Sequence, residues 1–173
     1  MKKKLMLIFI SIIVVGVFLW GCTIGEQQEI PDTEPGIIGY VMDMSDGRIL
    51  VISSEVQDFS ATGGIEEFYN AIWFSKAPEN IKIGDQVRVW FDSVAESYPG
   101  QSEVKHIEVM PEEKPDGADL SESEAINKAV ISYEKHHLAV KSLVFIKESD
   151  KWQIKLKDVM NDLEYDIEIE DEK

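Results

Sequence analysis

The sequence predicts a mainly β protein in two parts, a small five-stranded barrel over residues 37–110 and a small α+β domain over residues 121–173. In the first part, short apolar segments follow one another at the spacing of strands, with turn signals between them. In the second part, a helix-start motif precedes three strand-like segments. Between the parts, residues 111–120 (PEEKPDGADL) are polar and contain two prolines, which is typical of a linker.

The first part contains five predicted strands. Residues 37–44 and 48–55 are joined by Ser45-Asp46-Gly47, and Asp-Gly between two apolar runs is a strong hairpin signal. The other three strands are expected at 71–76, 86–94 and 103–110. Gly39 lies inside the first strand, where a barrel strand must bend. The number and order of the strands therefore predict a closed or partly closed barrel of the OB type.

A candidate ligand face follows from this architecture. Barrels of the OB type bind ligands on the face of their second and third strands, between the adjoining loops. Four residues fall on or beside that face: Arg48, Trp73, Phe74 and Tyr98. The stretch 56–70 contains Gly63-Gly64 and is long for a connection between strands. It is either a lid over the ligand or a short helix that closes the barrel.

Trp90 is a fifth candidate for the ligand face. Alternation along 86–94 places it on the same side as Arg88 and Asp92, and an aromatic ring among charges suits ligand contact. A ring that covers the end of the barrel or docks against the second part explains it equally well. We favour packing, because large rings are usually buried.

The second part begins with a capping box, Ser121-Glu122-Ser123-Glu124, and the helix is expected to run to about His137. Its apolar face comprises Ile126, Ala129, Val130, Tyr133 and His137. His136 and His137 close the last turn, where a cation suits the helix dipole. Neighbouring helical residues point in different directions and no third ligand is evident, so capping is favoured over a metal site.

Three strands are expected after the helix, at 138–148, 151–158 and 163–170. The last two alternate strictly, which predicts a hairpin with one apolar and one charged face. A turn at Met160-Asn161 places Lys157 opposite Glu164 and Lys155 opposite Asp166. With a turn at Asn161-Asp162 the same side chains stay on each face of the hairpin, but each lysine lies opposite the next acidic residue. In both registers the lysines and acids are structural pairs.

Charge and motifs exclude several functions. The chain has 33 acidic and 17 basic residues and a net charge of −16, which argues against nonspecific binding to nucleic acid or to an anionic membrane surface. No nucleophile elbow, phosphate-binding glycine loop or His-Glu-x-x-His motif is present, so neither a cofactor nor a metal is predicted. His106, beside Glu103 and Glu108, is a candidate base, but a solvated strand histidine is the favoured interpretation.

The N-terminus predicts export. Lys2-Lys3-Lys4 precedes an apolar run of 16 residues from Leu5 to Trp20, short of the roughly 20 that cross the hydrocarbon core. Cys22, the only cysteine, follows directly, so residues 1–22 are expected to be a signal ending at this cysteine. The alternative is an uncleaved membrane helix. Residues 23–36 (TIGEQQEIPDTEPG) are expected to be a flexible tether that reaches at most about 50 Å.

The end of this signal, Leu19-Trp20-Gly21-Cys22, resembles the lipobox of bacterial lipoproteins. The resemblance implies cleavage by signal peptidase II between Gly21 and Cys22, and a diacylglycerol thioether on the Cys22 sulfur. It also implies a location on the extracytoplasmic face of the cell membrane. Two acyl chains anchor a protein stably where a single chain is marginal.

Two further resemblances concern the folded parts. Residues 39–52, Ala71-Ile72-Trp73-Phe74 and residues 83–89 resemble the YobA-like lipoproteins, a family of unknown function, which implies a secreted OB-like domain. The helix and three strands over 121–170 resemble the small PepSY-type domains of secreted proteins. That likeness implies association with other proteins and restraint of proteases.

These observations predict a membrane-anchored extracytoplasmic lipoprotein that is a non-catalytic binding or protein-interaction module of the cell envelope. Its expected partners are the membrane, through the lipid on Cys22, and an envelope protein or a small ligand. The alternative is an envelope hydrolase with an unrecognised carboxylate site. A hydrolase of this kind needs a deep pocket that holds two carboxylates about 5–9 Å apart.

Overall fold

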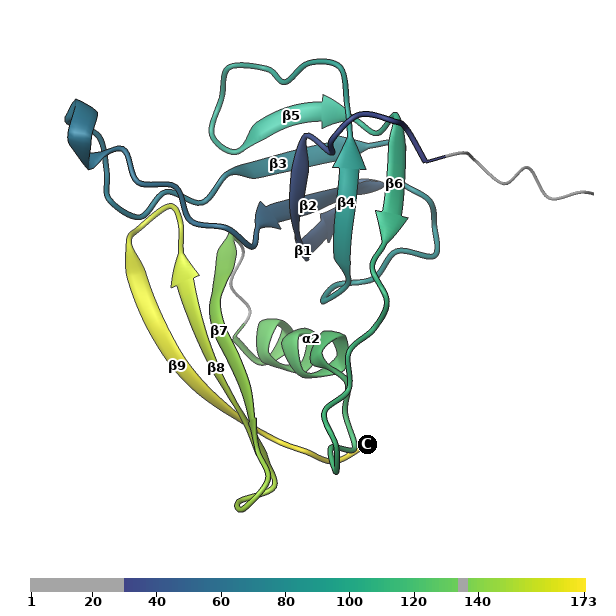
Figure 1. Ribbon diagram of the computed structural model, residues 1–173, viewed down its shortest axis with the longest axis vertical. Helices are drawn as coiled ribbons and strands as arrows, with labels where there is room; N and C mark the ends of the chain where they lie inside the picture. The colour runs from purple at the N-terminus through teal and green to yellow at the C-terminus, as the bar shows by residue number, and fades with distance from the viewer. Residues whose placement is uncertain (1–29, 134–136) are drawn as a thin grey trace, which may run out of the picture.

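The computed structural model describes residues 30–133 and 137–173. The predicted signal with Gly21 and Cys22, the first half of the predicted tether, and His136 lie outside the described residues. Within them, the chain forms a six-stranded sheet, a three-stranded sheet and one α-helix, α2 (Figure 1). The fold is thus mainly β, as predicted.

The first sheet has the strand order β5-β3-β2-β1-β4-β6. Its strands are β1 (Ile37–Ser45), β2 (Arg48–Ser53), β3 (Ala71–Ser75), β4 (Gln86–Trp90), β5 (Gly100–Glu103) and β6 (His106–Val109). This is an open order of six strands, so the predicted closed barrel of five is not confirmed. The difference arises in the last predicted strand, at 103–110, which is replaced by the two short strands β5 and β6.

The chain changes its partner between β5 and β6. β5 runs parallel to β3, whereas β6 runs antiparallel to β4. The two residues between them bond to different strands: the Val104 N–H donates to the Ser75 carbonyl and the Lys105 N–H to the Trp90 carbonyl. β5 has the sequence GQSE, which lacks the apolar alternation that marks a strand in the sequence.

The hairpin of β1 and β2 forms as predicted. Asp46 and Gly47 both have positive φ, at 52° and 71°, which is the geometry of a two-residue turn between twisted strands. β1 also pairs with β4, so the middle of β1 has a neighbour on both sides. At Gly39 a β-carbon would collide with the carbonyl group of Ile52, and the close approach of the two strands therefore requires glycine.

The stretch 56–70 forms an arm that extends away from the first sheet (Figure 1). Gln57 and Phe68 exchange both backbone hydrogen bonds, at 2.8 and 2.9 Å, and the Phe59 N–H donates to the Ile65 carbonyl. The short 3₁₀-helix η2 (Ser60–Thr62) forms the tip. The Phe68 ring of the arm lies 5.4 Å from that of Tyr98, so the arm contacts one of the predicted ligand-face residues.

The helix begins at the predicted capping box. The Ser121 N–H donates to Glu124 Oε2 at 2.9 Å, and the Glu124 N–H donates to Ser121 Oγ at 3.2 Å. α2 spans Glu122–Tyr133, and its buried face comprises Ala125, Ile126, Ala129 and Val130. The three residues after Tyr133 lie outside the described residues, and His137 has a φ of 68°, which is not helical.

The second sheet confirms the predicted strands and one of the two registers. β7 (Leu138–Ile146), β8 (Lys151–Asp158) and β9 (Leu163–Glu170) are antiparallel, in that order. Lys157 lies opposite Glu164, and Lys155 lies opposite Asp166. Lys155 Nζ is 3.4 Å from Asp166 Oδ1.

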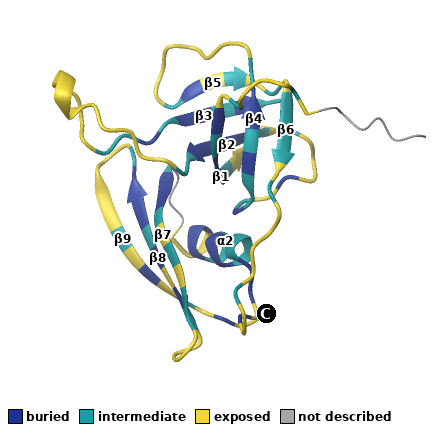
Figure 2. Cartoon of the chain, in the orientation of Figure 1, coloured by how far each residue is buried: buried dark blue, intermediate teal, exposed yellow. Residues whose placement is uncertain are grey.

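One hydrophobic core joins the two parts. It contains residues of the first sheet (Met42, Leu50, Ile52, Ala71), of the helix, and of the second sheet (Leu138, Val140, Trp152, Ile154, Leu156). The predicted linker contributes buried Ala118 and Leu120 to it. A second core lies on the other face of the first sheet, and β2 is buried on both faces (Figure 2). The two parts therefore pack as one unit.

Asp171 connects residues 111–120, the segment predicted to be a linker, to the second sheet. Its buried carboxylate accepts hydrogen bonds from the Asp119 and Leu120 N–H groups and, at 2.8 Å, from the Trp152 indole N–H. Burial opposes ionisation of this carboxyl, but the three hydrogen bonds outweigh it and hold the pKa of Asp171 below its ordinary value.

We expect Asp171→Ala to lower the free energy of unfolding by about 3 kcal/mol, because it leaves three donors without an acceptor. Urea denaturation at neutral pH measures the loss, with the exposed neighbour in Glu172→Ala as the control. Because the pKa of Asp171 is lowered in the folded state, its contribution is present above the ordinary pKa of 3.8 and disappears as the pH falls below it. Equal losses in the two variants would contradict this role.

Candidate functional site

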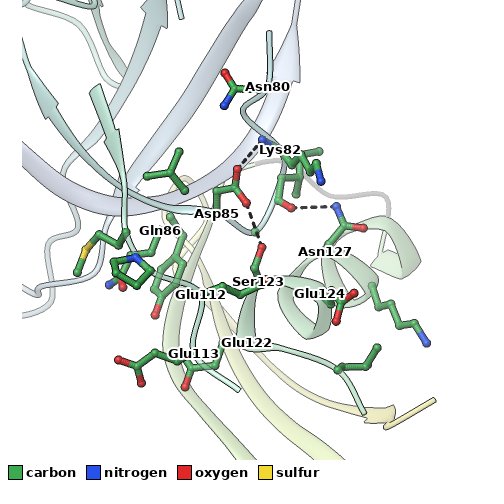
Figure 3. A pocket seen from close by; sticks show the side chains of 18 of the residues that line it. Asn80, Lys82, Asp85, Gln86, Glu112, Glu113, Glu122, Ser123, Glu124 and Asn127 are labelled. Atoms are coloured by element: carbon green, nitrogen blue, oxygen red, sulfur yellow. Dashed lines mark hydrogen bonds between the residues drawn. The ribbon is translucent and has the colours of Figure 1, made fainter. Parts of the chain in front are cut away.

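A cleft of about 720 Å³ lies where the two parts of the chain meet (Figure 3). One wall is the turn before β4, residues 80–86, and another is the first half of α2. Tyr40, residues 109–113, Leu120 and Lys173 complete the lining. The cleft exists only because the helix packs beside the first sheet.

Asp85 fixes the turn against the helix. Its carboxylate accepts from the Lys82 N–H at 2.8 Å and from the Ser123 hydroxyl at 3.1 Å, as Figure 3 shows. One turn further along the helix, the Asn127 side-chain amide donates to the Ile83 carbonyl at 3.0 Å. Two elements distant in sequence are thereby held at a fixed separation.

Gly84 permits this close approach. Its φ is 98°, and a β-carbon here would collide with the Ser123 carbonyl oxygen of α2. The turn Ile83-Gly84-Asp85 directly precedes β4. Its contact with the helix could not be predicted, because nothing in the sequence indicated that the parts share a core.

Carboxylates gather on the wall formed by 112–113 and the start of α2 (Figure 3). The Glu113 carbonyl accepts from the Glu122 N–H at 2.9 Å, and the Ser121 hydroxyl donates to Glu112. Burial, and then the negative charge of Glu113, raise the pKa of the Glu122 carboxyl. Burial also raises the pKa of Tyr40, and both glutamates add to that shift.

Sequence reasoning missed this site. Glu113 lies in a segment that had the composition of a linker, and Glu122 belongs to the capping box. A structural role therefore explained each glutamate in the sequence, and neither was considered as part of a site. The arrangement offers a protonatable carboxyl beside a second carboxylate and a phenol, a combination suited to holding a proton or a cationic group. Among residues 30–133 and 137–173, no group of three or more His, Cys, Asp or Glu side chains is placed to hold a metal ion.

The structure brings together only two of the five predicted ligand-face residues. Arg48 Cζ lies 5.2 Å from the centre of the Trp73 ring, a cation–π contact. The His137 ring meets the same indole edge-on at 6.5 Å. Phe74 is fully buried in the second core, with its ring 5.3 Å from that of Phe91, and so does not reach a ligand.

Trp90 and Tyr98 lie elsewhere. Trp90 is buried, as the packing interpretation expects, and its indole N–H donates to the Thr33 carbonyl at 2.7 Å. The end of the predicted tether is thus docked beside β4. The Tyr98 hydroxyl donates to the Tyr69 carbonyl, and burial raises the pKa of Tyr98 to about 12. The His106 ring contacts that of Trp90, with 5.1 Å between ring centres.

The second part covers the face where the ligand was expected. Leu50, Ile52 and Ala71, from the second and third strands, belong to the same core as Leu138 and Val140 of β7. The apolar face of these strands therefore has a partner within the chain. A ligand therefore has no access to this face except at the seams between the two parts.

Comparison with known proteins finds a family likeness for part of the chain. Residues 38–111 match a family model described as a protein of unknown function (DUF3221). The match spans the first sheet almost entirely and stops before α2. No curated protein and no solved structure matches the chain.

We expect Gly84→Ala to destabilise the protein more than Gly47→Ala. Both glycines have positive φ, so each substitution costs about 1 kcal/mol in backbone strain. Nothing lies within 4 Å of the β-carbon site at Gly47, whereas at Gly84 the new methyl collides with the helix. Urea denaturation should show an additional loss of about 2 kcal/mol for Gly84→Ala. Equal losses would mean that the helix does not rest on this turn.

Proposed function

We propose that the chain is a lipid-anchored, extracytoplasmic binding module of the cell envelope, and that the cleft between its two parts is its ligand site. The cleft itself carries the proposal. Its volume of about 720 Å³ is that of a small-molecule site, and its walls come from both parts of the chain. Ligands commonly bind at such junctions because the walls supply both apolar surface and a few fixed polar groups.

The anchor is argued from the sequence. Leu19-Trp20-Gly21-Cys22 has the pattern of a lipobox, and the chain has no other cysteine. None of the helices in the described part of the chain has the length and apolar character needed to span a bilayer. With the three leading lysines removed, the net charge becomes −19, so the lipid rather than surface charge would hold the protein at the membrane.

The strand pairings support an OB-like first part. β1 pairs antiparallel with β4, and β3 pairs parallel with β5. Only Val104 and Lys105 separate β5 from β6, so the two edges of the sheet are joined through the chain. We interpret β5 and β6 as one barrel strand broken in the middle. The order of helix and three antiparallel strands in the second part supports the likeness to the PepSY-type domains.

A second candidate function is favoured by one observation. Glu122 has a raised pKa and lies beside Glu113 in a cleft, which is the arrangement of a general acid with a second carboxylate. An envelope hydrolase would use this pair. We place binding first because Glu122 also begins α2, and burial at that position explains its pKa without catalysis.

We expect Cys22→Ser to abolish labelling by radioactive palmitate and to release the mature protein from membranes. The thiol is the acceptor for the diacylglycerol, so no lipid is attached without it. Cell fractionation with an antibody against the folded part measures the release. Wild-type protein that takes up no palmitate and keeps its N-terminus would establish an ordinary membrane helix instead.

Incubation of the full chain with purified cell-wall polymer separates binding from hydrolysis. We expect no release of soluble fragments above that of the Glu122→Gln variant. Release that Glu122→Gln abolishes and Glu79→Gln retains would establish the hydrolase. Glu79 is a suitable control because it is exposed and lies outside the cleft lining.

A further inference from the structure

A second groove lies between the arm and the turn that joins β8 to β9. Its volume is about 670 Å³, and it shares no lining residue with the cleft. Apolar side chains from three segments form its walls: Ile65, Phe68, Tyr69, Tyr98, Val159 and Met160. In Figure 1 the arm extends above this turn at the left of the molecule.

Ion pairs hold the arm in place. The Glu67 carboxylate lies 2.9 Å from Lys141 Nζ and 2.8 Å from Lys157 Nζ, so one arm residue bridges two strands of the second sheet. The Lys157 side chain is only 10% exposed and also pairs with Asp162. Hydrogen bonds from Lys157 and Lys141 lower the pKa of Glu67 to about 2, so the bridge persists at neutral pH.

Aromatic contacts complete the floor of the groove. The Phe68 ring lies 5.6 Å from that of Phe59 and 5.4 Å from that of Tyr98. Tyr98 is fixed in turn by its hydrogen bond to the Tyr69 carbonyl. The groove is therefore preformed, which reduces the entropic cost of binding.

Exposed apolar surface is concentrated here. Among residues 30–133 and 137–173, thirteen large hydrophobic side chains are exposed, and six of them lie on the arm or around the groove: Val56, Phe59, Ile65, Tyr98, Met160 and Leu163. Ile65 is 60% exposed. Apolar residues scattered singly need no explanation, but a cluster on an otherwise acidic protein indicates a contact surface.

The charges around the groove indicate what kind of molecule can bind there. Glu66, Glu67 and Asp162 line it against a single lysine, Lys157, which is already paired with two carboxylates. Asp58 adds negative charge on the arm, and Glu55 directly precedes the arm. An occupant must therefore combine apolar surface with positive charge. Anionic lipid and a second copy of this chain, with its net charge of −16, both fail the second requirement.

We infer that the groove docks a segment of another protein in which an apolar anchor side chain is flanked by lysine or arginine. The anchor enters between Ile65 and Met160, over the Phe68 and Tyr98 rings, and the basic flanks face Glu66 and Asp162. This surface is independent of the cleft, so it extends the proposed function from a ligand site to a site for a protein partner.

Fluorescence anisotropy with short labelled peptides tests the inference. The probe has one phenylalanine flanked by lysines; in one companion the lysines become glutamates, and in the other the phenylalanine becomes serine. We expect the probe to bind the full chain at least about tenfold more tightly than either companion, since one buried aromatic anchor is worth that much. Ile65→Ser should weaken the probe about tenfold, whereas Val144→Ser, an exposed apolar residue on β7, should not.

Charge reversal supplies the second readout. Glu66→Lys should weaken the lysine probe and strengthen its glutamate companion, whereas Glu79→Lys should do neither. The inference is overturned if no peptide binds, if the serine companion binds as tightly as the probe, or if Ile65→Ser leaves binding unchanged. Binding of phosphatidylglycerol vesicles that Ile65→Ser abolishes would also overturn it, in favour of a lipid surface.

Discussion

The apolar contact between the first sheet and the second part of the chain determines the rest of the structure. Leu50, Ile52 and Ala71 present one face of β2 and β3 to Leu138 and Val140 of β7. Each large aliphatic side chain buried in such a contact contributes about 1.5–3 kcal/mol. The only cysteine is Cys22, so no disulfide can hold the parts together, and this core must do so.

Both recognition surfaces are consequences of that contact. The cleft has the turn before β4 on one side and α2 on the other, and Asp85 and Gly84 set their separation. The groove needs Glu67 from the arm and Lys141 and Lys157 from the second sheet. The second part of the chain covers the face of the first sheet that β2 and β3 present to β7. The cleft and the groove lie at the edges of this contact.

The sequence predicts elements whose signals are local. Four consecutive apolar residues mark β2, the capping box marks the start of α2, and the alternation along β8 and β9 marks their two faces. The alternation allows two registers, and the structure adopts the one that places Lys157 opposite Glu164. β5 could not be predicted, because GQSE has no apolar pattern and forms a strand only through its backbone pairing with β3. Residues 111–120 were predicted to be a linker because the segment is polar in sequence. Only Ala118 and Leu120 in it are buried.

The candidate site was harder to predict than the fold. Trp73 and Phe74 are neighbours in β3, and neighbouring strand residues point to opposite faces, so they cannot contact one ligand together. Tyr40, Asp85, Glu113 and Glu122 line one cleft although they are spread along the chain. These groups become neighbours only through the packing of the core, and a local sequence pattern does not indicate which distant residues that packing brings together.

Native-state hydrogen exchange tests the central claim, that one core makes the two parts a single cooperative unit. The backbone amides of Leu50 in β2 and Ile154 in β8 belong to different sheets and to the same core. If one core joins the two sheets, both amides exchange only through global unfolding, with equal free energies of opening and equal dependence on urea. A lower free energy of opening for Ile154 than for Leu50 would show instead that the second part unfolds by itself.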